Sequence, residues 1–101
     1  MGGPFVGELI DTFGQDAVEL IATLRRTLAA ADVDGFRRAA HSLKSTSQSL
    51  GANGLAARAR ELESAARAGS LDGAGARVQA LAEHYERVAH TLGGIRRDLS
   101  A

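Results

Sequence analysis

The sequence predicts an all-α fold: an antiparallel up-down-up-down four-helix bundle with a short extra helix at its N-terminus. Alanine and leucine supply much of the 45% hydrophobic share, whereas the chain has three phenylalanines, one tyrosine and one proline. This composition favours helices over strands. Apolar residues recur every three or four positions in several segments, and glycines fall mostly between those segments. The 101 residues suffice for one small domain with a single core.

The first third of the chain is predicted to hold two helices. Pro4 suits a first helical position, and the short amphipathic helix that follows it reaches Phe13, where Gly14 loosens its end. A second helix then extends to about residue 31, with apolar residues at 17, 20, 21, 24 and 28. Residues 1–3 are expected to be an expression remnant or a flexible start, and residues 4–101 to form the four-helix domain.

Three further helices are expected downstream. One begins at Asp32–Asp34 and runs to Leu50, and Gly51 stands where a helix commonly ends. Asn53 is expected to cap the next helix and Asp72 the last one. The last helix has the most regular apolar stripe, which consists of Val78, Leu81, Tyr85, Val88, Leu92, Ile95 and Leu99.

Composition excludes several classes of function. Twelve basic and twelve acidic residues give no net charge, so the basic bias of nucleic-acid-binding proteins is absent. Without cysteine the chain can form neither a disulfide framework nor a thiolate zinc site. No run of about 18 to 20 apolar residues suggests a membrane span. Recognition of a partner is therefore expected to be local.

One histidine lies on the polar side of the helix predicted to end at Leu50. On a helical wheel His41 is about 140° from Phe36, at the centre of the apolar stripe, and therefore faces solvent. Its neighbours on that surface are basic or can donate hydrogen bonds: Arg37, Arg38, Lys44, Ser45 and Gln48. These surroundings suit a phosphate group, although an inert polar surface is the alternative. Neither His84 nor His90 is followed by a lysine three residues later, and both are expected to be ordinary surface or boundary residues.

The segment around His41 carries a motif. Residues 39–52 read AAHSLKSTSQSLGA, and Leu55-Ala56 and Glu61-Leu62-Glu63 follow. This run closely resembles the signature of histidine-containing phosphotransfer (HPt) domains, roughly A-H-x-L-K-G/S-x-S-x-x-L-G-A followed by a leucine and a downstream L-E. Only Ser45 departs from the commoner glycine, and serine is an ordinary variant there. The expected helices agree in length and order, so the resemblance covers nearly the whole chain.

The resemblance implies a function. In the HPt family, a histidine displayed on a four-helix bundle accepts a phosphoryl group from a receiver-domain aspartate and passes it to another receiver's aspartate. Here that histidine would be His41, and Lys44 would stabilise the phosphoryl oxygens. The implied partners are receiver domains of response regulators or hybrid histidine kinases. Magnesium belongs to the receiver in this family, so no cofactor and no metal site are expected in this chain.

The receiver is expected to dock around His41, on the helix that carries it and the two preceding helices. The candidate supporting residues are Arg37, Arg38, Ser45 and Gln48. Gly51, besides ending its helix, would keep the surface low enough for the receiver's loops to approach. Ile10 or Phe13 would add an exposed apolar contact.

Two alternatives stay open. A binding-only bundle of the same shape would dock a partner without phosphotransfer, whereas a chemotaxis-type phosphotransfer domain would be phosphorylated by a kinase domain. The presence of His41, Lys44 and Gly51 favours phosphotransfer, and Leu50-Gly51-Ala52 favours the relay type. The chain is then a phosphotransfer intermediate rather than an autonomous enzyme. It is expected to be a cytoplasmic monomer, either free or part of a membrane-anchored hybrid histidine kinase.

Overall fold

The computed structural model describes residues 3–100, with side chains from residue 6 to residue 99. This part of the chain forms four helices and no strand: α1 (Gly3–Ala29), α2 (Val33–Leu50), α3 (Asn53–Arg67) and α4 (Ala74–Ser100). The predicted all-α fold is confirmed. Of the expected flexible start, residues 1–2 lie outside the described residues, and Gly3 already belongs to α1.

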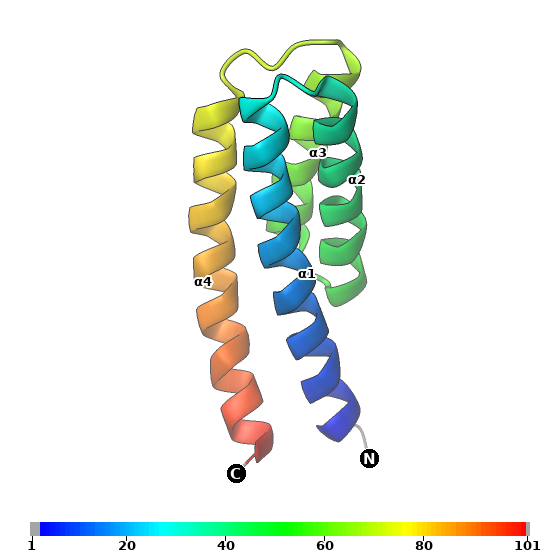
Figure 1. Ribbon diagram of the computed structural model, residues 1–101. Helices are drawn as coiled ribbons and strands as arrows, with labels where there is room; N and C mark the ends of the chain where they lie inside the picture. The colour runs from blue at the N-terminus through cyan, green and yellow to red at the C-terminus, as the bar shows by residue number, and fades with distance from the viewer. Residues whose placement is uncertain (1–2, 101) are drawn as a thin grey trace.

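The helices form an antiparallel bundle in which each helix packs against its neighbours in the chain, and α1 also packs against α4. Helix α1 is therefore diagonal to α3, and α2 is diagonal to α4. At 27 residues each, α1 and α4 are longer than α2 and α3, with 18 and 15. They project together beyond the other two helices at the end that carries both termini (Figure 1). The molecule is consequently elongated, with extents of 46 × 20 × 20 Å.

The predicted separate N-terminal helix is wrong, because α1 runs without a break through Gly14. A glycine inside a helix costs about 1 kcal/mol relative to alanine. Here Phe13 and Ala17 are buried on either side of Gly14, and the Tyr85 hydroxyl donates to the Gly14 carbonyl at 3.5 Å. Packing against α4 thus keeps both halves of the apolar stripe on one helix, and Gly14 does not end it.

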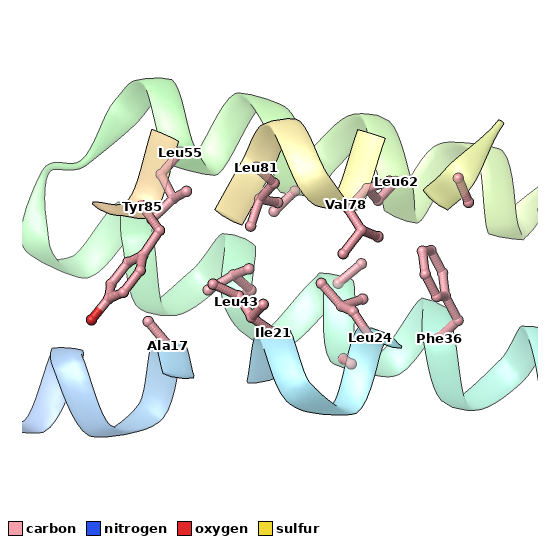
Figure 2. Packing of buried hydrophobic residues seen from close by; sticks show 14 of the residues in the cluster. Ala17, Ile21, Leu24, Phe36, Leu43, Leu55, Leu62, Val78, Leu81 and Tyr85 are labelled. Carbon is pink, nitrogen blue, oxygen red and sulfur yellow. The ribbon is translucent and has the colours of Figure 1, made fainter. Parts of the chain in front are cut away.

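The core is built from the apolar stripes of all four helices. Figure 2 shows Leu24 of α1, Leu43 of α2 and Leu81 of α4 converging in its centre. The stripe of α4 is buried only in its first half, and Ile95 and Leu99 are exposed. Helices α2 and α3 end before they could cover that projecting part (Figure 1). The regular stripe of α4 therefore extends beyond the core that it helps to build.

Two of the four expected helix caps, those at the two ends of α2, are confirmed. Asp32 caps α2 by accepting a hydrogen bond from the Gly35 amide at 2.9 Å, and Gly51 ends α2 in the left-handed conformation, with φ of 84°. Asn53 does not cap α3, because Ala52 occupies the cap position without a side-chain hydrogen bond. Asp72 does not cap α4 either, since Gly73, with φ of 72°, stands directly before Ala74. In both cases the backbone turn places the polar residue one position away from the cap.

Candidate functional site

His41 lies on α2 beside α3, with its side chain 52% exposed. Its Nδ1 lies 2.8 Å from Oε2 of Glu63 on α3. The predicted exposure of His41 is confirmed. Because Nδ1 is directed at Glu63, the other ring nitrogen, Nε2, is the one left for a partner.

Glu63 is the centre of the site. Its side chain is only 4% exposed, and both carboxylate oxygens have partners. Lys44 places Nζ 2.8 Å from Oε1, while Arg67 donates from Nη2 to Oε2 at 3.0 Å, the same oxygen that contacts His41. Three nitrogen groups therefore surround one buried carboxylate, which is the usual condition for a buried charge to be tolerated.

The charge state of Glu63 follows from these contacts. The hydrogen bond from Lys44 is the main cause that lowers the pKa of Glu63 to about 2; burial opposes it, and the bond to His41 adds to it. The carboxylate is therefore ionised at neutral pH and can only accept hydrogen bonds. Nδ1 of His41 must then carry the proton in that bond, which leaves the lone pair of a neutral imidazole on Nε2.

Arg37 and Arg38 bind a different carboxylate. Arg37 Nη2 lies 2.8 Å from Oδ1 of Asp34, and Arg38 Nε lies 3.1 Å from Oδ2. The hydrogen bond from Arg37 is the main cause that lowers the pKa of Asp34, followed by the charge of Arg38. Both arginines are thus ion-paired near the start of α2. Lys44 instead pairs with Glu63, and Glu63 together with His41, Lys44 and Arg67 is called the Glu63 cluster below.

The remaining candidates differ in exposure. Ser45 and Gln48 are exposed on α2, and Gly51 is exposed at its end, where an added Cβ would meet no atom within 4 Å. Ile10 and Phe13 are buried, so the prediction that they form an exposed apolar contact is wrong. Their stripe faces the core because α1 is one continuous helix packed along the bundle.

Sequence reasoning missed the roles of Glu63 and Arg67. A signal for Glu63 was present, because it stands four residues after Ala59 and eight after Leu55, on the buried face of α3. A carboxylate on an apolar face needs a cationic partner. Arg67, one turn further along α3, follows from Glu63 by the spacing of helical ion pairs.

The other two histidines have different surroundings. His84 is partly buried, and burial, Arg58 and Arg87 lower its pKa, in that order. His90 is exposed on α4. Within residues 6–99, neither ring makes a hydrogen bond or ion pair comparable to that between His41 and Glu63.

The apolar groove of the bundle lies away from His41. An apolar groove of about 800 Å³ is lined by residues of α1 and α4, on the edge of the bundle opposite the α2–α3 edge that carries His41. In the described part of the chain, no three His, Asp or Glu side chains gather closely enough to hold a metal ion. Nor does any described helix combine the length and apolarity that would let it cross a membrane.

Fold and site together define a class of protein: a four-helix bundle that presents one exposed histidine, oriented from behind by a buried carboxylate. The model of the Hpt domain family matches residues 8–91, so the chain belongs to the Hpt domain family. A solved structure, that of histidine-containing phosphotransfer protein B (HptB) from Pseudomonas aeruginosa PAO1, is similar, with 34% identity and a TM-score of 0.89. The similarity covers 91% of this chain and 80% of that one. No curated protein matches the sequence. The chain is a histidine phosphotransfer module of the phosphorelay type.

Proposed function

We propose that this module carries the phosphoryl group on Nε2 of His41. The observation that supports this assignment is the bond from Nδ1 of His41 to Glu63. An ionised carboxylate at Nδ1 keeps the proton there, and thereby holds the Nε2 lone pair ready on an exposed ring.

Phosphoryl transfer to His41 is a displacement at phosphorus. The Nε2 lone pair attacks the phosphorus of an aspartyl phosphate on a receiver domain, the N–P bond forms, and the P–O bond breaks to release the aspartate carboxylate. Positive charge develops on the imidazole ring during this step, and Glu63 stabilises it from the Nδ1 side. Attack by a second receiver's aspartate reverses these bond changes and returns the electron pair to Nε2.

Lys44 supports the phosphoryl group in this proposal. It follows His41 by one helical turn, so its ammonium group is near the surface that Nε2 faces. Transfer passes through a loose transition state with charge on the phosphoryl oxygens, which a nearby cation stabilises. Because Nζ already lies 2.8 Å from Glu63, Lys44 divides its charge between the carboxylate and the phosphoryl group.

Receiver domains are the partner kind that belongs to this family. We place their docking face around His41, where Ser45 and Gln48 are exposed and can donate hydrogen bonds. The receiver contributes the acidic, magnesium-binding part of the active site, and this chain the positioned nucleophile. Location in the cytoplasm and a monomeric state are further predictions of the proposal. Fractionation of the native cell and sedimentation of the purified chain test them.

Labelling with phosphoramidate, a small phosphoryl donor, tests the assignment without a receiver. We expect acid-labile, base-stable label on the wild-type chain, on His84→Gln and on His90→Gln, and no label on His41→Gln. A panel of phosphorylated receiver domains then tests relay. Label on His41→Gln would refute the assignment, and label that never leaves any receiver would favour a binding-only bundle.

A further inference from the structure

In the proposed transfer, Arg67 is the one member of the Glu63 cluster that has no assigned role. Its Nη2 donates to Oε2 of Glu63 at 3.0 Å, and its side chain is 62% exposed. Ion pairs between exposed residues four apart on a helix contribute little. This pair differs, because Glu63 is 4% exposed and its Oε2 also accepts the hydrogen bond from His41.

Once His41 is phosphorylated, two negative groups attract Lys44: the carboxylate of Glu63 and the phosphoryl group. In the present structure its ammonium group lies 2.8 Å from Oε1 of Glu63, with the side chain 20% exposed. A phosphoryl group on Nε2 adds close to two negative charges one helical turn away. These charges draw the ammonium group from Glu63, and a buried carboxylate that loses its cation is strongly disfavoured.

We propose that Arg67 is a positioning residue that holds Glu63 while Lys44 turns towards the phosphoryl group. The guanidinium keeps a positive charge on Oε2, so that Glu63 stays ionised and stays bonded to Nδ1 of His41. Arg67 therefore acts through Glu63 and Lys44, without contacting the phosphoryl group. This inference rests on the proposed function, because it requires a phosphoryl group on His41.

Its consequence is that the effect of Arg67 depends on Lys44. With Lys44 present, Arg67→Gln should slow phosphorylation of His41 about fivefold, which corresponds to one moderately strong ion pair. In a Lys44→Gln background Arg67 is the remaining arginine or lysine on Glu63, so the same substitution should slow labelling by more than fivefold. A guanidinium that touched only the phosphoryl group could be removed without changing the protonation of Nδ1 in the unlabelled double variant.

The experiment is a double-mutant cycle on the full chain. Phosphoramidate labelling rates are measured for the wild type, Arg67→Gln, Lys44→Gln and the double variant, and Arg67→Lys should recover part of the lost rate. Arg60→Gln is the matched control, because Arg60 is an exposed arginine of the same helix for which the described residues provide no ion pair. Nitrogen-15 spectra of the imidazole report whether Nδ1 keeps its proton, and circular dichroism reports folding.

The outcomes separate this inference from the proposed function. A fivefold loss that grows in the Lys44→Gln background, in a folded double variant whose Nδ1 is no longer protonated before labelling, supports the role of Arg67. An unchanged rate in Arg67→Gln, or a loss that shrinks in the Lys44→Gln background, refutes that role and leaves His41 as the phosphorylated residue. A wild-type chain that takes no label on His41 overturns both.

Discussion

Nδ1 of His41 lies 2.8 Å from Oε2 of Glu63, and this hydrogen bond joins α2 to α3 between residues 22 positions apart. The side chain that receives a phosphoryl group is thus oriented from a second helix. A substitution that separates α2 from α3 near His41 should change the orientation of the imidazole ring before it unfolds the bundle.

Replacing the carboxylate is the most direct test of that orientation. In Glu63→Gln one oxygen becomes an amide group that cannot accept hydrogen bonds, although Lys44, His41 and Arg67 all donate to this side chain. Phosphoramidate labelling of His41 should fall about tenfold, the equivalent of 1.4 kcal/mol. The free energy of unfolding should fall by about 1 to 3 kcal/mol, because the partly buried Lys44 loses its partner.

Glu61→Gln is the control for this substitution, since Glu61 is exposed on the same helix. It should change neither the labelling rate nor the midpoint of urea unfolding. Wild-type labelling by Glu63→Gln would contradict the orienting role of the carboxylate.

The same carboxylate predicts a pH dependence of stability. Hydrogen bonding by Lys44 lowers the pKa of Glu63 from 4.5 to about 2 in the folded chain, with His41 contributing and burial opposing. A group with a depressed folded pKa stabilises fully above its unfolded pKa, and that contribution is lost as pH falls towards the folded pKa. The difference in unfolding free energy between wild type and Glu63→Gln should therefore shrink as pH falls from 4.5 to 2. Urea unfolding over this range measures it, and a constant difference would speak against the lowered pKa.

Ser47 provides a prediction about the core. The side chain is fully buried on α2, and among the described residues its Oγ has no hydrogen-bond partner. A buried hydroxyl without a partner is destabilising, and alanine is the better helix former. Ser47→Ala should therefore raise the unfolding free energy by about 1 kcal/mol. Exposed Ser49→Ala is the comparison, and a destabilised Ser47→Ala would indicate that the hydroxyl has a partner after all.

Gly51 tests the end of α2. Its φ of 84° lies in the left-handed region, and an added Cβ would meet nothing within 4 Å. The cost of Gly51→Ala should therefore be purely conformational, a loss of about 1 kcal/mol of unfolding free energy. Gly51→Asn should lose less, because asparagine tolerates this conformation better. Thermal unfolding of the two variants measures how much unfolding free energy each one loses. Equal losses would indicate a lost contact instead of a backbone preference.

Much of the structure could be predicted from local sequence patterns. Residues 36, 40, 43 and 47 predict the buried face of α2, and they are buried as expected. The same spacing places His41 in solvent, where it is found. Helix ends were less predictable, because the turns after α2 and α3 shift which residue stands at each cap. Asn53 and Asp72 are both displaced from the cap by the turn that precedes the helix.

The helical class, the exposure of His41 and the end of α2 at Gly51 followed from local sequence patterns. These properties depend on residues within a few turns of one another, for which spacing and backbone preference suffice. The continuation of α1 through Gly14, and the position of Glu63 between His41, Lys44 and Arg67, became known only from the packed bundle. Packing between helices determines both, and the spacing within a single helix does not specify which side chains of the next helix it will meet.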